Sequence, residues 1–125
     1  MIVADSDVLI DFLRGRQPAA RVSAAIAAGT LATTAISAFE LRSGARTTKE
    51  TAATEGLLAG LSVLPFDARA SEAAAECRRK LEAEGRTIGM ADYLIAGICI
   101  SRAAVLLTRN RRHFDRIPQL AVDFL

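Results

Sequence analysis

The sequence is poor in the residues that mark several common protein classes. It has no tryptophan, one histidine and two cysteines, and Cys77 and Cys99 do not have the spacing of a zinc-binding pair. Both cysteines fall in helix-like stretches, so we expect two reduced thiols in the core. We interpret the only histidine, His113, as a surface residue in a basic loop, and one histidine gives no basis for a zinc site.

Long apolar runs and targeting signals are also scarce. The longest apolar stretch, residues 93–100, is too short to span a bilayer, and no signal peptide or lipidation motif is visible. We therefore expect a cytoplasmic protein with no membrane contact. The net charge of +2 does not by itself indicate nucleic-acid binding. The basic residues, however, are 14 arginines and 2 lysines, and arginine binds phosphate through a planar fork. A GC-rich genome is the other explanation for that bias.

Short apolar stretches alternate with helical patterns along the chain. The 125 residues, 51% of them hydrophobic, predict a single domain spanning 1–125. The predicted strands are 1–4, 30–34, 62–65, 104–108 and 121–124, and the predicted helices are 7–15, 18–28, 38–45, 48–61, 68–84 and 88–102. This alternation predicts an α/β fold, with helices on both faces of a central, mostly parallel sheet of four to five short strands.

Three carboxylates stand out from the solvated majority. Asp5 follows the first strand directly, and Asp92 is the only charge in an apolar helix. Glu40 follows the second strand, although Ser37 and Glu40 also have the spacing of a capping box. Parallel strands end at one edge of a sheet, so these carboxylates are expected to converge and repel one another. A divalent cation would remove the repulsion, and oxygen ligands favour Mg²⁺ or Mn²⁺.

Each of the other acidic candidates has an ordinary structural explanation. Asp7 is a suitable cap for the first helix, and we expect Asp11 to be solvated. Thr87 is expected to cap the helix that carries Asp92. For Asp92 itself, the alternatives to metal binding are the helix dipole or an arginine from elsewhere in the chain.

Four segments in order resemble the PIN-domain ribonucleases, and among them the VapC-type toxins of bacterial toxin–antitoxin pairs. They are residues 3–11 (VADSDVLID), 37–45 (SAFELRSGA), 89–96 (GMADYLIA) and 107–114 (LTRNRRHF). The resemblance implies a PIN-like αβα sandwich with metal ligands at Asp5, Glu40 and Asp92. Thr108 would form a hydrogen bond within the site. Asn110 stands where many relatives carry a fourth acid, and Asp7 stands where many carry asparagine.

The same resemblance implies a magnesium-dependent endoribonuclease, for which Mn²⁺ is a possible substitute. Its partners would be an RNA substrate, a cognate antitoxin protein and a second copy of the chain in a homodimer. The arginines proposed to hold RNA phosphates are Arg14, Arg109, Arg111 and Arg112.

Two other functions remain open at this stage. The first is a catalytically weak PIN domain that binds RNA or protein. This alternative stays open because Asn110 carries an amide where many relatives carry a fourth acid. The second is a phosphatase of the haloacid dehalogenase type, suggested by the Asp5-Ser6-Asp7 motif. That chemistry also requires a lysine, and neither Lys49 nor Lys80 is suitably placed.

Overall fold

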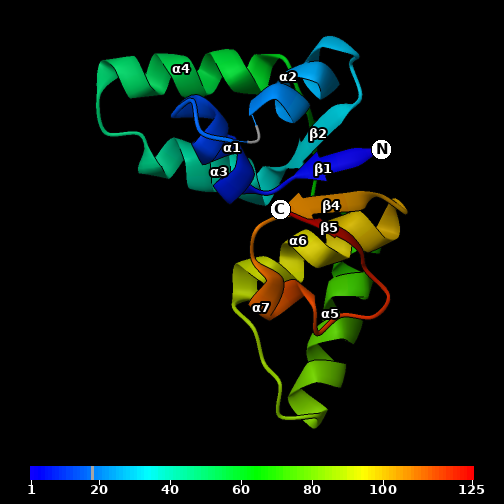
Figure 1. Ribbon diagram of the computed structural model, residues 1–125. Coiled ribbons are helices and arrows are strands. Elements are labelled where there is room, and N and C mark those ends of the chain that lie inside the picture. The colour runs from blue at the N-terminus through cyan, green and yellow to red at the C-terminus, as the bar shows by residue number, and fades with distance from the viewer. Residues whose placement is uncertain (18) are drawn as a thin grey trace.

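A computed structural model describes residues 1–17 and 19–125 of the chain. In chain order its elements are β1 (Ile2–Ala4), α1 (Ser6–Leu13), α2 (Ala19–Ala27), β2 (Leu31–Thr34), α3 (Ala35–Gly44), α4 (Thr48–Ala59), β3 (Ser62–Leu64), α5 (Ala68–Ala83), α6 (Met90–Ser101), β4 (Val105–Thr108), α7 (Arg111–Phe114) and β5 (Ala121–Phe124). The strands form one sheet in the order β3-β2-β1-β4-β5, and every neighbouring pair is parallel. The predicted α/β fold is confirmed (Figure 1).

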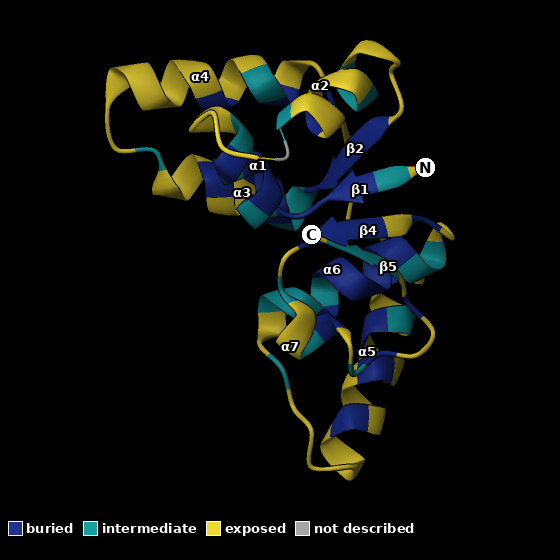
Figure 2. Cartoon of the chain, in the orientation of Figure 1, coloured by how far each residue is buried: buried dark blue, intermediate teal, exposed yellow. Residues whose placement is uncertain are grey.

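The sheet separates two hydrophobic clusters because successive side chains of a strand point to opposite faces. In β1, Val3 belongs to the cluster under α5, α6 and α7, whereas Ala4 belongs to the cluster under α1 to α4. Leu106 and Leu107 of β4 divide in the same way. Figures 1 and 2 show the buried strands between the two helical layers. This is the three-layer αβα sandwich that the alternating pattern predicts.

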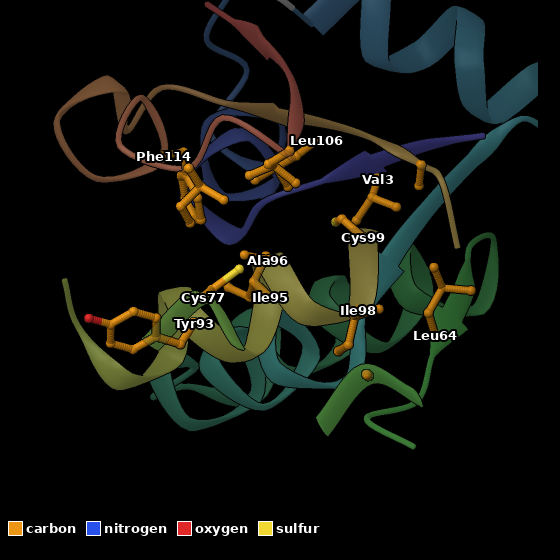
Figure 3. Packing of buried hydrophobic residues seen from close by; sticks show 14 of the residues in the cluster. Val3, Leu64, Cys77, Tyr93, Ile95, Ala96, Ile98, Cys99, Leu106 and Phe114 are labelled. Atoms are coloured by element: carbon orange, nitrogen blue, oxygen red, sulfur yellow. The ribbon is translucent and has the colours of Figure 1, made fainter. Parts of the chain in front are cut away.

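Helix α6 is the most deeply buried helix, as its apolar sequence predicts. Its side chains meet the sheet and α5 in the larger cluster (Figure 3). At Gly97 a Cβ atom would lie 2.5 Å from the carbonyl oxygen of Ala70 and 2.6 Å from the Cβ of Ala74. Only glycine allows the two helices to approach so closely. The close packing fixes α6, and therefore Asp92 in its first turn.

The caps of α3 and α6 differ from the sequence predictions. Thr34, the last residue of β2, caps α3, and its side chain accepts a hydrogen bond from the backbone N–H of Ser37. Ser37 therefore lies inside the helix, and the predicted capping box with Glu40 is wrong. Helix α6 begins at Met90, with Gly89 as a cap that provides no side-chain hydrogen bond, so the predicted cap at Thr87 is also wrong.

Most other element predictions agree with the structure to within a few residues. Asp67 caps α5, and Cys77 and Cys99 are buried free thiols, as expected. The predicted start of the second helix, Pro18, lies outside the described residues. Within the described ranges, no helix combines the length and the apolar character that crossing a membrane requires.

Candidate active site

Asp5 lies where β1 ends, at the carboxyl edge of the parallel sheet. Its Oδ2 accepts a hydrogen bond of 2.7 Å from the Thr108 hydroxyl, and its Oδ1 accepts one of 2.8 Å from the backbone N–H of Ser6. The side chain also caps α1, a role that the sequence analysis gives to Asp7, so that prediction is wrong. Only 6% of Asp5 is exposed.

The environment of Asp5 opposes its negative charge. Burial, followed by the nearby Asp7 carboxylate, raises the pKa of Asp5 from an ordinary 3.8 to about 6. The hydrogen bonds from Thr108 and Ser6 lower this pKa, and the charge of Asp92 raises it further. Among the ion pairs of the described residues, none involves Asp5. A buried carboxylate without a positive partner is the main anomaly of the structure.

Glu40 approaches the same edge from α3 and is the most exposed of these carboxylates. Burial raises its pKa first, and the charges of Asp92 and Asp7 raise it further, while a hydrogen bond with the Ser6 side chain lowers it. Glu40 is therefore close enough to both aspartates to feel their charge. Ser6 is a site residue that the sequence analysis missed, although it lies between two acidic candidates.

Asp92 lies in the first turn of α6, and its partner is a histidine rather than an arginine. Its Oδ2 is 2.5 Å from Nδ1 of His113, and the side-chain amide of Asn110 is 3.2 Å from the same nitrogen. The backbone N–H of Asn110 donates to the Thr108 hydroxyl at 3.1 Å, which links this group to Asp5. His113 is thus a partly exposed residue of the short helix α7 (Arg111–Phe114), and its contacts with Asp92 and Asn110 make it part of the site region. No local sequence pattern reveals this contact, because Asp92 lies on another helix, 21 residues away.

Asp7 and Asp11 hold the loop that follows β4. Oδ2 of Asp7 accepts a hydrogen bond of 3.2 Å from the backbone N–H of Arg109, and burial raises the pKa of Asp7. Oδ1 of Asp7 is buried and has no hydrogen-bond partner among the described residues. Asp11 is buried rather than solvated, because it pairs with the guanidinium groups of Arg109 and, at 3.7 Å, Arg16. Its expected solvation is therefore wrong.

The acidic cluster, defined as Asp5, Asp7, Glu40 and Asp92, fits a hard divalent cation by its chemistry. Its donors are all oxygen, Asp5 is buried without a basic partner, and one oxygen of Asp7 is unsatisfied. As the side chains stand, no three acidic, histidine or cysteine residues in the described ranges are arranged to hold a metal ion. Carboxylates that repel one another spread apart, and their side chains would have to close around an ion.

The four arginines predicted to bind RNA occupy different environments. Arg109 is engaged with Asp11, and Arg111 stacks over the ring of Phe124 with 4.3 Å from its Cζ to the ring centroid. Arg112 is exposed, and Arg14, the C-cap of α1, lines a groove of about 510 Å³ between α1, α3 and α4. Glu40 also lines this groove.

Comparison with known proteins identifies the family of this chain. The sequence profile of the PIN domain matches residues 2–120. Ribonuclease VapC10 of Mycobacterium tuberculosis is 36% identical, and the alignment covers 99% of this chain and 93% of that protein. The tRNA(fMet)-specific endonuclease VapC of Shigella flexneri is 27% identical over 95% of this chain and 93% of that protein.

Solved structures agree with the sequence comparison. The chain matches one in the structure of VapBC2 from Rickettsia felis bound to a DNA fragment from their promoter with a TM-score of 0.90 and 25% identity. That match covers 100% of this chain and 99% of the other. DNA-bound VapBC from Salmonella typhimurium gives a TM-score of 0.89 and 27% identity, with coverage of 98% and 96%.

Proposed function

Because the chain belongs to the PIN domain family and is similar over its whole length to VapC ribonucleases, we propose that it is an endoribonuclease acting as the toxin of a toxin–antitoxin pair. The observation that carries the proposal is Asp5: a buried carboxylate, without a basic partner among the described ion pairs, at the carboxyl edge of a parallel sheet and close to the charges of Asp7 and Asp92. PIN-domain ribonucleases are in general metal-dependent. We propose Mg²⁺ as the ion here, with Mn²⁺ as a substitute.

We propose Asp5, Asp92 and Glu40 as the residues that hold the ion. When bound, a divalent cation lowers the pKa of a water molecule and stabilises the charge that develops on the phosphate. Thr108 and the N–H of Ser6 fix both oxygens of Asp5, so its orientation does not depend on the substrate. Glu40 is more exposed and has a raised pKa, which suits it to orient the attacking water and accept its proton.

RNA would lie across the carboxyl edge of the sheet, where its phosphates meet arginine side chains. Arg112 is exposed, and Arg14 lies at the groove beside Glu40. Arg109 and Arg111 already have partners within the chain, so we assign them to shaping this surface as well as to binding phosphate. Such contacts should weaken as salt rises, because binding releases counterions.

The groove between α1, α3 and α4 is the proposed seat of the antitoxin's C-terminal segment. Its walls are apolar at Ile10, Leu13 and Leu41, and it reaches Glu40. A segment lying there could place an arginine among the carboxylates and block the site. We also propose that the chain forms a homodimer through the apolar faces of its first helices. Its site of action would be the cytoplasm.

The test compares wild type with Asp5→Asn, and with Asp115→Asn as a matched control at an exposed position. Purified, metal-stripped proteins are given RNA with Mg²⁺, Mn²⁺ or EDTA. We expect wild type and Asp115→Asn to cleave RNA only with a metal, and Asp5→Asn to be inactive. Equal RNA turnover by wild type and Asp5→Asn, or none by either, would favour the binding-module alternative. Sequencing of RNA ends after brief induction in cells then identifies the cleaved RNA.

The phosphatase alternative is not favoured by the structure. Asp7, which would act as the acid, accepts a backbone hydrogen bond from Arg109, and Lys49 and Lys80 lie on α4 and α5. A phosphoenzyme trapped on Asp5 would contradict the nuclease proposal.

A further inference from the structure

His113 is held firmly although it lies on a single helical turn. The next residue, Phe114, is 1% exposed and belongs to the core cluster beneath α6, as Figure 3 shows. The backbone N–H of Phe114 donates to the carbonyl of Asn110 at 3.3 Å, which closes the turn. A buried anchor one residue away leaves the imidazole little freedom to move relative to α6.

The contacts of His113 determine which of its ring nitrogens carries a proton. Nδ1 lies 2.5 Å from Oδ2 of Asp92, and an ionised carboxylate can only accept a hydrogen bond, so Nδ1 must donate. The amide of Asn110 is 3.2 Å from the same nitrogen. Rotating the Asn110 side-chain amide by 180° exchanges its oxygen Oδ1 and its nitrogen Nδ2. Only the oxygen can accept a hydrogen bond from a protonated Nδ1. As the side chains stand, Nδ2 of Asn110 faces Nδ1, and a half-turn of the amide would let Asp92 and the Asn110 carbonyl share one donor.

We propose that His113 is a positioning residue that orients Asp92 for metal binding, an inference that rests on the proposed function. By holding Oδ2, the imidazole fixes the rotation of the Asp92 carboxylate and leaves Oδ1 for the ion. Asp92 is itself a member of the acidic cluster, and its charge raises the pKa of both Asp5 and Glu40. The orientation of Asp92 therefore affects these two carboxylates as well. Partners that orient a metal ligand in this way commonly change metal affinity or activity by about 10- to 100-fold.

Two observations separate positioning from the other roles open to a histidine. Nδ1 of His113 is engaged by the Asp92 carboxylate and the Asn110 amide, so this nitrogen is not free to bind an ion directly. It is also not an isolated surface residue, because its partly exposed side chain contacts both Asp92 and Asn110. Sequence alone gives no sign of this role, because Asp92 is 21 residues away.

The experiment uses three substitutions in the full chain. His113→Asn keeps a donor at the position of Nδ1, His113→Gln moves the donor to the position of Nε2, and His113→Ala removes it. Asp92→Asn tests the proposed function itself. The readouts are Mn²⁺ affinity, measured by electron paramagnetic resonance of free Mn²⁺, the kcat and KM for RNA cleavage, and the unfolding midpoint in EDTA.

We expect Asp92→Asn to lose Mn²⁺ binding and His113→Asn to stay within about threefold of wild type. His113→Gln and His113→Ala should bind Mn²⁺ about tenfold or more weakly, with a lower kcat and an unchanged KM. Equal Mn²⁺ affinity in all three His113 variants, with binding lost in Asp92→Asn, overturns the inference and leaves the proposed function intact. Losses that follow only the unfolding midpoints also overturn it, since they indicate a structural role. Unchanged Mn²⁺ binding in Asp92→Asn overturns both.

Discussion

Asp5→Asn should make the metal-free protein more stable while abolishing its activity. Asp5 is 6% exposed, and its surroundings raise its pKa from 3.8 to about 6. At about 1.4 kcal/mol per pKa unit, that rise corresponds to roughly 3 kcal/mol of unfavourable interaction once the carboxylate is ionised. Asparagine has the same shape without the charge, so the substitution removes this term.

The sign of the pH dependence follows from the direction of the shift. A raised pKa means that folded Asp5 binds its proton more tightly than the unfolded chain does. Between pH 3.8 and about 6 the folded protein therefore holds more protons, and the free energy of unfolding falls as pH rises through that window. The raised pKa values of Asp7 and Glu40 act in the same direction. Wild type in EDTA should be less stable at pH 7.5 than at pH 5.

The assay is urea unfolding in EDTA at pH 5 and pH 7.5, for wild type, Asp5→Asn and the exposed control Asp115→Asn. We expect the stability of Asp5→Asn to exceed that of wild type by about 1–3 kcal/mol at pH 7.5, because the amide NH₂ cannot accept one of the two hydrogen bonds from Thr108 and Ser6, and this loss offsets part of the gain. The difference should shrink towards pH 5. Adding Mg²⁺ should stabilise wild type but not Asp5→Asn, because only the former binds the ion.

The reasoning fails if Asp5→Asn is less stable than wild type in EDTA at pH 7.5, or if both proteins show the same dependence on pH. Either result would mean that the buried charge is already compensated. A metal ion could then not be inferred from it.

Three further substitutions test other parts of the structure. Gly97→Ala places a Cβ 2.5 Å from the Ala70 carbonyl oxygen and should lower the free energy of unfolding, measured with urea, by about 1–3 kcal/mol. An unchanged unfolding midpoint would contradict the close packing of α5 and α6. Thr108→Val removes the donor to Asp5 and should weaken Mn²⁺ binding with a cost of about 1–3 kcal/mol in stability, whereas unaltered binding would show that Asp5 needs no support. Arg112→Ala should weaken RNA binding and reduce the salt dependence of log K by about 0.7, measured by titration at several salt concentrations, and an unchanged slope would remove it from the interface.

The sequence predicted the fold well where the signal is local. The alternating strands and helices, the apolar α6 and the position of Asp5 after β1 all follow from short patterns. The pattern of serine or threonine followed three residues later by glutamate occurs twice, at Ser37 and at Thr47. Only Thr47 forms a capping box, with Glu50, because Thr34 already caps α3. Two suitable caps three residues apart compete, and the strand that ends at Thr34 decides between them.

The errors in the site arise from contacts between distant segments. Asp11 looked solvated because its partner Arg109 is 98 residues away, and the contact of His113 with Asp92 was missed because Asp92 comes from another helix. A helical pattern reveals which residues share a face, but not which loop lies over that face. Partners of this kind become visible only once the strand order brings the loop after β4 beside α1 and α6.

The central position of β1 has a consequence for synthesis of the protein. Strand β1 pairs on one side with β2 but on the other side with β4, which is synthesised much later than either. Until β4 emerges, the N–H of Asp5 lacks the carbonyl of Leu107 and its side chain lacks the Thr108 hydroxyl. A nascent chain still short of β4 thus carries Asp5, Glu40 and Asp92 without the strand that fixes Asp5. Under the proposed function, the nascent chain gains ribonuclease activity only after β4 has been synthesised and has paired with β1.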